Sequence, residues 1–87
     1  MMEMSSVPRL AAGCRLHATD DILLVPEGTL NLSGPAREIL ARIDGKRTVN
    51  AIVDDLLLQF DGANADEIQQ DVLEMLNRMR QRGVIRA

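Results

Sequence analysis

The segment TVNAIVDDLLLQF, residues 48–60, decides the fold class of this 87-residue chain. Its apolar residues recur at spacings of three and four over the whole segment, a pattern typical of an amphipathic helix. They are Val49, Ile52, Val53, Leu56, Leu57 and Phe60. Thr48 is a good N-cap and Asp61-Gly62 ends the pattern, so we expect one helix with an apolar face turned toward a core.

Two further helices flank this segment. Before it, Ser33 is a candidate N-cap, Pro35 is tolerated in a first turn, and Gly45 suits a left-handed C-cap. After it, Asn64 and Glu67 have the spacing of a capping box that opens a third helix. The residues expected to face inward are Ala36, Ile39, Leu40 and Ile43 in the first helix, and Ala65, Ile68, Val72, Met75, Leu76 and Met79 in the third.

The segment before these helices predicts three short strands. Loose alternation over residues 14–18, the β-branched-rich run Ile22–Val25 and alternation over residues 29–32 each fit a strand. Asp20-Asp21 and residues 26–28 have the composition of turns between them. Three strands linked in this way form an antiparallel meander, which needs helices over one face to be stable.

The predicted fold is therefore α+β and winged helix-turn-helix-like, with a three-stranded antiparallel β-meander followed by three α-helices (β-β-β-α-α-α). Residues 1–7 show no periodicity, so we expect them to form a flexible tail before a single domain over residues 8–87. Val84-Ile85, which follow Gly83 at the end of the third helix, form a short apolar tail that we expect to dock. A domain of this size buries only about 60% of its unfolded surface and is marginally stable.

The composition argues against several classes of function. Aromatic residues make up 1% of the chain and the net charge is −3, so neither base stacking nor a positive field attracts nucleic acid or anionic lipid. The single cysteine, Cys14, permits neither an internal disulfide nor a cysteine zinc cluster. No apolar run approaches the roughly 20 residues of a membrane span, and residues 1–7 lack the pattern of a signal peptide. We expect a cytoplasmic protein.

Few side chains offer chemistry. His17 is the only histidine and has no visible partners for metal binding or general-base catalysis, so a surface histidine is the simpler interpretation. Cys14 is more simply a small buried residue than a nucleophile. The carboxylates of Asp20-Asp21 and of Asp54-Asp55 point apart, and the glycines do not form a phosphate-binding loop. We therefore predict no enzyme activity, no catalytic residue, no metal and no cofactor.

The arginines near the C-terminus keep one alternative open. Arg78, Arg80, Arg82 and Arg86 in a winged helix-turn-helix-like fold are compatible with a DNA-binding regulator. A phosphate backbone would repel the carboxylates in the preceding turns of the same helix, and the helix dipole alone accounts for the arginines. We favour a protein without nucleic-acid or membrane partners and keep the winged-helix DNA-binding regulator as the alternative.

Two features predict a peptide-binding groove. The strand over residues 29–32 can lie at the edge of the small sheet, where an extended peptide can add as a further strand. At about 100° per residue, Gln69, Leu73, Leu76 and Arg80 form a ridge beside the core stripe of the third helix. A wider buried face is the other explanation of this ridge. If the ridge borders the edge strand, the two form a groove that would hold a peptide.

Short runs along the chain form a further pattern. They are Pro8-Arg9-Leu10 with Gly13, residues 23–28, Leu30-Asn31-Leu32, Ile39-Leu40, Asp44-Gly45, Thr48-Val49 with Ile52, Glu67-Ile68, Asp71-Val72, Leu76 and Gly83. In their order and spacing they resemble the PqqD family, pyrroloquinoline quinone biosynthesis protein D. Ala51 stands where relatives often carry a glutamate, and Val84 stands where they often carry an aromatic residue. These departures weaken a helix cap and the docking of the tail.

The resemblance implies a non-catalytic chaperone that binds the precursor peptide PqqA and presents it to the radical S-adenosylmethionine enzyme PqqE in pyrroloquinoline quinone biosynthesis. It also implies the fold of a peptide-recognition element, in which the leader peptide adds beside the third strand and lies against the third helix. Carried onto this sequence, the peptide-binding residues are Thr29, Leu30, Asn31, Leu32, Leu73, Leu76, Asn77 and Arg80. Because the domain is small, a homodimer formed by strand exchange at residues 26–28 stays open beside a monomer.

Overall fold

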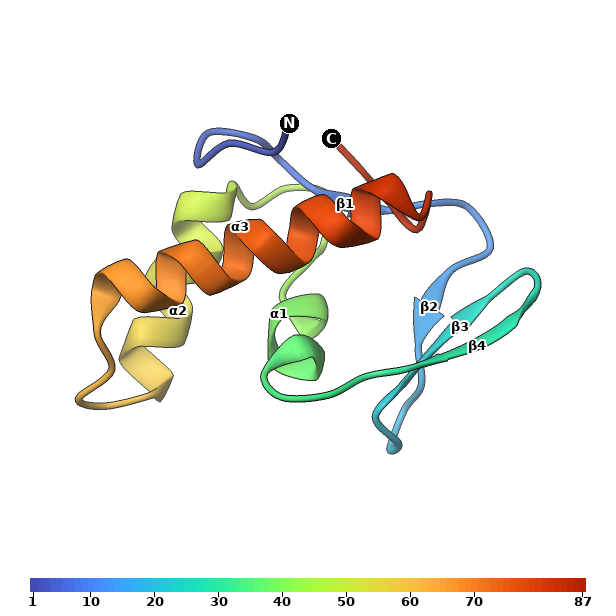
Figure 1. Ribbon diagram of the computed structural model, residues 1–87, viewed down its shortest axis with the longest axis horizontal. Helices are drawn as coiled ribbons and strands as arrows, with labels where there is room; N and C mark the ends of the chain where they lie inside the picture. The colour runs from blue at the N-terminus through green and yellow to red at the C-terminus, as the bar shows by residue number, and fades with distance from the viewer.

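The computed structural model describes all residues, 1–87, as five short strands and three helices (Figure 1). The strands are β1 Arg9–Leu10, β2 Arg15–Leu16, β3 Ile22–Val25, β4 Gly28–Asn31 and β5 Ile85–Arg86. The helices are α1 Ala36–Ala41, α2 Val49–Gln59 and α3 Ala65–Gln81. The predicted α+β order, a three-stranded antiparallel meander followed by three helices, is confirmed. The pairing of β1 with β5 adds a second sheet that no sequence pattern indicates.

The strand β3 is the central strand of the meander, in the order β2-β3-β4. It has the bounds predicted from its apolar run, whereas β2 is shorter than the predicted residues 14–18 and β4 begins and ends one residue before the predicted 29–32. Leu23 lies opposite Leu30 and is fully buried, so the sheet meets the hydrophobic core through its central strand. The rest of the sheet extends to one side of the helices (Figure 1).

Side-chain oxygens begin the two longer helices as the sequence predicts. Thr48 Oγ1 accepts a hydrogen bond from the Ala51 amide at 3.1 Å, so the cap forms without the glutamate that relatives often carry at that position. Asn64 Oδ1 accepts hydrogen bonds from two amides of the first turn of α3. The first helix differs, because its N-cap is Pro35 and no side chain caps it. Ser33 stands two residues too early and contributes its carbonyl oxygen to the preceding turn instead.

The end of the chain returns to its beginning in the small sheet of β1 and β5. Leu10 lies opposite Ile85, and Arg9 lies opposite Arg86. Val84 and Ile85 are buried, which confirms the predicted docking of the apolar tail. This pairing joins residues about 75 positions apart and closes the chain over the C-terminal end of α3.

Residues 1–7, expected from the sequence to be a flexible tail, pack against α2 and α3 in the structure. Met2 is 3% exposed and belongs to the hydrophobic core. Its amide donates a hydrogen bond to Asn77 Oδ1 at 2.7 Å, and the Asn50 amide donates one to the carbonyl oxygen of Met4 at 2.9 Å. A single buried methionine has no periodicity, so its docking leaves no pattern for sequence analysis to detect.

Arg42 joins α1 to α2. Its Nε donates a hydrogen bond to Asp55 Oδ2 at 2.6 Å, and its Nη1 donates to Glu38 Oε2 at 3.0 Å and to the Glu38 carbonyl oxygen at 2.8 Å. Gln59 contributes to the same network by hydrogen bonds to both Arg42 and Glu38. The hydrogen bonds from Arg42 and then Gln59 hold the pKa of the Glu38 carboxyl below its ordinary value of 4.5.

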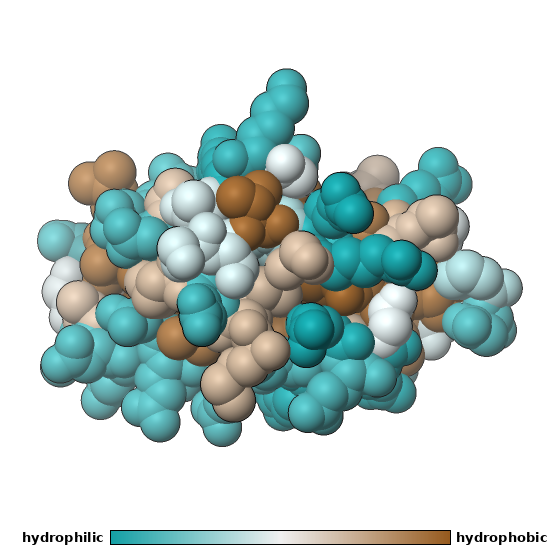
Figure 2. All heavy atoms as spheres, turned by 90° about the horizontal axis from the view of Figure 1, so that it is seen from above, coloured by the Kyte–Doolittle hydropathy of each residue, from teal (hydrophilic) through white to brown (hydrophobic).

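The core lies between the three helices and receives side chains from β3, β5 and the N-terminal segment. Its buried members are Met2, Leu23, Ala36, Ile39, Leu40, Val49, Ile52, Val53, Leu56, Val72, Met75, Leu76, Val84 and Ile85. No polar or charged residue is fully buried. Figure 2 shows one face of the surface, where hydrophobic residues form small separate groups among hydrophilic ones. None of the helices has the length and apolar character required to cross a bilayer.

Candidate functional site

The strand β4 has an open edge, because β3 pairs with one side of it and no strand pairs with the other. The Leu32 amide donates a hydrogen bond to the Asp21 carbonyl oxygen at 2.8 Å, just beyond the end of the ladder. Bonding residues alternate along an antiparallel ladder, so Leu30 bonds to β3 as well. Thr29 and Asn31, which lie on either side of Leu30, therefore direct their backbone N–H and C=O groups away from the sheet.

The hydrogen bonds between β2 and β3 give the same alternation of backbone directions. The His17 amide donates a hydrogen bond to the Ile22 carbonyl oxygen at 2.9 Å. Ile22 and Leu24 thus bond toward β2, and the intervening Leu23 bonds toward β4, where it lies opposite Leu30. The hydrogen bonds on both sides of β3 therefore indicate that the unpaired backbone groups of β4 belong to Thr29 and Asn31.

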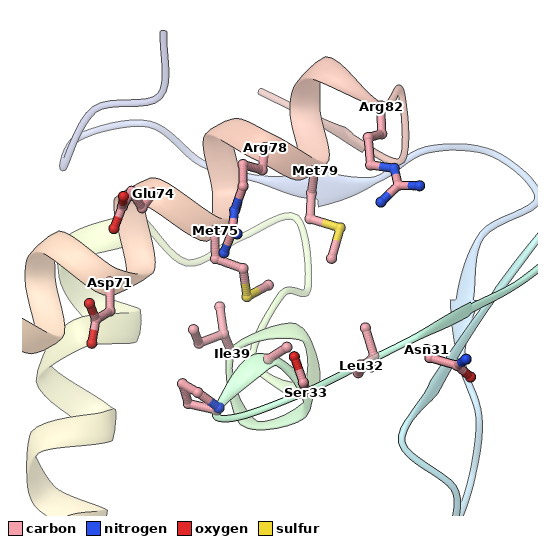
Figure 3. Close-up of a pocket in the computed structure, with 12 residues that line it drawn as sticks. Asn31, Leu32, Ser33, Ile39, Asp71, Glu74, Met75, Arg78, Met79 and Arg82 are labelled. Atoms are coloured by element: carbon pink, nitrogen blue, oxygen red, sulfur yellow. The ribbon is translucent and has the colours of Figure 1, made fainter.

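A hollow of about 340 Å³ lies between the end of β4, α1 and the side of α3. Its lining from the strand side and α1 is Asn31, Leu32, Ser33, Pro35, Ala36 and Ile39, and its lining from α3 is Asp71, Glu74, Met75, Arg78, Met79 and Arg82. Figure 3 shows Met75 and Met79 projecting from α3 toward Ile39 and Leu32, which form the opposite side. The hollow thus has an apolar floor with charged side chains along its α3 wall.

A second, smaller hollow continues along β4 toward the β3–β4 turn. It is lined by Val25, Glu27, Thr29, Leu30, Arg82 and Val84, and it shares Arg82 with the first hollow. We call the two hollows together the β4–α3 trough. The trough follows β4 from the turn to the start of α1, so a chain added to the open edge of β4 would have α3 beside it.

The structure brings the strand half of the predicted binding set to the trough. Asn31 and Leu32 line the larger hollow, and Thr29 and Leu30 line the smaller one. Leu30 and Leu32 pack against the core, whereas Thr29 and Asn31 are exposed. A role for these four residues in binding a peptide stays a prediction.

The helix half of the predicted set lies elsewhere. Leu76 is fully buried in the core. Leu73 and Asn77 line a different hollow beside the docked residues 1–2, and Arg80 lines another beside β1 and β5. None of these four residues lines the trough, and a role for them in binding a peptide stays a prediction.

The α3 wall of the trough consists instead of a stripe that includes Met75, Arg78, Met79 and Arg82. A helical wheel gives the angles between side chains, but it does not say which of two polar flanks of the core stripe meets the strand. The docked N-terminal segment occupies the other flank. The sequence signal that could have found the trough is the pair of four-residue spacings, methionine to methionine and arginine to arginine, on one side of the helix.

His17 has a structural place outside the trough. Its Nδ1 accepts hydrogen bonds from the amides of Thr19 and Asp20, at 3.2 Å and 3.0 Å. The imidazole therefore closes the turn between β2 and β3. Neither His17 nor Cys14 lines the trough, whose lining offers backbone groups, apolar surface and charges.

Comparison with known proteins places these features in a family context. The sequence profile of the family described as coenzyme PQQ synthesis protein D (PqqD) matches residues 22–85. The chain is 36% identical to a PqqA binding protein of Azotobacter vinelandii over 86 residues, which cover 94% of this chain and 91% of that protein. It is 36% identical to a PqqA binding protein of Xanthomonas euvesicatoria pv. vesicatoria over 85 residues, covering 93% and 91%.

The fold is also similar to a solved structure. The solution NMR structure of the PqqD part of Methylobacterium extorquens PqqCD, described as a functional and stand-alone RiPP recognition element, matches with a TM-score of 0.84 at 34% identity. The match covers 100% of this chain and 96% of that one. The docked ends and the meander are therefore both included in the similarity.

Proposed function

Because the chain belongs to the PqqD family, we propose that it binds the precursor peptide PqqA as a strand added to β4 and presents that peptide to the radical S-adenosylmethionine enzyme PqqE. The observation that carries this proposal is the open edge of β4 beside the trough. Thr29 and Asn31 offer unpaired backbone groups there, and α3 supplies a wall within reach of the side chains of an added strand.

The two surfaces of the trough have different roles in the proposal. Backbone pairing with β4 is independent of the peptide's side chains and supplies affinity for any extended segment. Contacts with Met75, Met79 and Leu32 depend on the side chains of the peptide and supply selection. Methionine side chains suit this role because they are flexible and adapt to different apolar partners.

We propose that the protein acts as an adaptor in the cytoplasm without catalysing a reaction itself. Peptide binding through backbone groups and apolar contacts orders an extended segment but makes or breaks no covalent bond. The chemistry on the peptide would then belong to PqqE, which receives it from this protein. An intertwined homodimer formed through the β3–β4 turn is a further proposal, which light scattering with and without peptide would test.

The peptide proposal is tested by a proline at Asn31. Asn31→Pro removes an outward amide and places a ring at the open edge, while leaving the bonds from β4 to β3 in place, since proline is tolerated where the amide faces solvent. The matched variant Asn31→Ala keeps the amide. We expect calorimetric titration with PqqA to show at least about tenfold weaker binding for the proline variant only, as loss of a hydrogen bond and a steric clash both act.

The opposite results would contradict the proposal. Equal PqqA affinity for Asn31→Pro and Asn31→Ala, with both variants folded by circular dichroism, would exclude the edge of β4. A proline at Leu30 is a poorer test, because it would remove an amide that bonds to β3 and so would weaken the hairpin itself.

The DNA-binding alternative is tested in the same titration. Arg78 and Arg82 line the trough together with Asp71 and Glu74, while Arg80 lies on another face of α3. The arginines therefore do not form a single basic face. Tight and steeply salt-dependent binding of duplex DNA, without binding of PqqA, would replace the peptide proposal by the regulator.

A further inference from the structure

The charged side chains of the α3 wall are separated by sign along the trough. Asp71 and Glu74 lie in the middle of α3, and Arg78 and Arg82 follow them toward and just past its C-terminal end (Figure 3). The sequence of charges along this wall is therefore acidic, then basic, with Met75 and Met79 projecting between and beside them.

These four charges have no partner within the protein. Every salt bridge of the structure involves Arg42 or Arg47, and no side-chain hydrogen bond involves any of the four. Glu74 and Arg78 are four residues apart on one helix, a spacing that favours an ion pair, yet they form none. Their charged groups are thus available to a ligand in the trough.

The helix dipole explains part of the order of acidic and basic residues along α3. It does not determine how these charges act on a peptide in the trough. Acidic residues are favoured near the start of a helix and basic residues near its end on every face, and Glu67 and Arg80 follow the same rule outside the trough. On the trough side, however, the same gradient lies beside the strand edge where the peptide would add. A bound peptide must therefore match the gradient or oppose it.

The direction of the peptide follows from the direction of β4. Along the trough the chain runs from Asn31 through Leu32 to Ser33, opposite to the direction of α3 from Asp71 to Arg82 (Figure 3). All pairings within the meander are antiparallel, and antiparallel pairing is the commoner and slightly more stable arrangement. A peptide added antiparallel to β4 would run in the same direction as α3, so its N-terminal part would meet the acidic end.

We infer that the trough selects a peptide segment with a basic residue on the N-terminal side of an apolar residue and an acidic residue on the C-terminal side. This inference rests on the proposed peptide-binding function and adds to it the charge order of the substrate. The basic residue would lie near Asp71 and Glu74, the apolar residue against the methionines, and the acidic residue near Arg78 and Arg82.

The geometry also gives the spacing. A helix rises about 1.5 Å per residue, so the midpoints of the acidic pair and the basic pair lie about 11 Å apart along α3. A strand advances about 3.3 Å per residue and returns to the same face every second residue. The basic and acidic residues of the peptide are therefore expected at positions i and i+4, with the apolar residue at i+2. Glu27 lines the trough beyond Arg82 and limits the basic stretch in that direction.

The test compares two synthetic peptides with the same composition. Both are capped eleven-residue peptides of serine and threonine with a central valine; one has lysine two residues before the valine and glutamate two residues after it, and the other has these charges exchanged. In NMR titrations at low salt we expect the lysine-first peptide to bind about tenfold more tightly, because exchange turns attractive contacts into repulsive ones. The preference should fall to about twofold at high salt.

Reciprocal variants of the protein sharpen this test. In the double variant Glu74→Arg with Arg78→Glu each end of the wall keeps one charge of either sign, so the preference for the lysine-first peptide should be lost. The matched control, Glu67→Arg with Arg9→Glu, makes the same exchange outside the trough and should keep the preference of the unmodified protein. Circular dichroism of both variants verifies that α3 is retained.

The outcomes separate this inference from the function on which it rests. Suppose that both peptides bind the unmodified protein equally well and that Asn31→Pro abolishes this binding. This result would overturn the charge order and leave the peptide-binding function standing. A preference for the glutamate-first peptide would overturn the antiparallel orientation and with it the inference. Failure of both peptides and of PqqA to bind would overturn the inference and the proposed function together.

Discussion

The two small sheets of this protein differ in how they are attached to the helices. The pairing of β1 with β5 closes the chain, and Val84 and Ile85 at its C-terminal side are buried in the core (Figure 1). The meander of β2, β3 and β4 places one fully buried side chain, Leu23, in the same core and extends beyond the helices. One sheet secures the fold, and the other presents an open edge.

This difference teaches where such a domain can bind a partner without unfolding. Free backbone groups at a strand edge are needed for strand addition, and such an edge cannot also be covered by the core. The chain keeps the open edge on the sheet that extends beyond the helices. The sheet formed by the chain ends lies over the helices and joins β1 to the buried Ile85.

The largest expected effect comes from a substitution in the sheet of β1 and β5. Ile85 is 1% exposed, so Ile85→Ala should lower the free energy of unfolding by about 2–5 kcal/mol. Leu30 on β4 is only partly buried, and Leu30→Ala should cost about 1 kcal/mol. Urea denaturation of the two variants, with Leu58→Ala at the exposed surface as control, measures the difference. Equal losses for Ile85 and Leu30 would contradict the division of roles between the sheets.

A smaller effect tests the helical body to which both sheets are attached. Arg42→Met should remove the hydrogen bonds between α1 and α2 and lower the free energy of unfolding by about 1 kcal/mol. The control is Arg47→Met, since Arg47 makes longer contacts of 3.6 Å and 3.7 Å from a half-exposed position, and such surface pairs contribute little. Thermal unfolding measures both variants. A larger loss for Arg47→Met would show that the network is misassigned.

A substitution that stabilises the sheet of β1 and β5 provides the opposite test. Arg9 and Arg86 lie directly opposite each other, and like charges in this position are unfavourable. We expect Arg9→Glu to raise the free energy of unfolding by about 0.5 kcal/mol without changing the affinity for PqqA. Arg15→Glu, on β2 opposite Leu24, gains no such pair and should leave stability unchanged. Weaker peptide binding by Arg9→Glu would show that the two sheets are coupled.

The smallest expected effect is on the stability of the protein at acid pH. The pKa of Glu38 is lowered by hydrogen bonds from Arg42 and Gln59, and the pKa of Asp44 is lowered by hydrogen bonds from the Lys46 and Arg47 amides. A lowered pKa in the folded state gives stability that is present above the unfolded values of 4.5 and 3.8 and is lost as the pH falls through the folded pKa values. The double variant Glu38→Gln with Asp44→Asn should therefore show a shallower fall of melting temperature below pH 4.5. An unchanged slope would assign the acid sensitivity to other groups.

The sequence predicted those parts of the fold whose causes are local. Thr48 and Asn64 begin α2 and α3 through their own side-chain oxygens, and the apolar run Ile22–Val25 between two turns gives β3 its observed bounds. The sheet of β1 and β5 could not be predicted in this way, because each strand has two residues and its partner lies at the other end of the chain. The docking of Met2 has the same cause.

Half of the residues predicted for the candidate site line the trough. The strand side follows from alternation and from the position of residues 29–32 at the end of the meander, which local patterns indicate. The helix side depends on how α3 is rotated against the rest of the protein, and that rotation is fixed by packing. Met75 shows the difficulty, since it belongs to the core stripe predicted from the sequence and also lines the trough. One side of this helix both packs into the core and lines the trough.

Amide hydrogen exchange with and without PqqA tests the central claim most directly. In the free protein the Thr29 and Asn31 amides should exchange rapidly, since they point away from β3, while the Leu30 amide between them is protected. On binding of PqqA, the amides of Thr29 and Asn31 should become protected and that of Leu30 should change little. Binding of PqqA that leaves both outward amides exchanging at their free rates would contradict strand addition at β4.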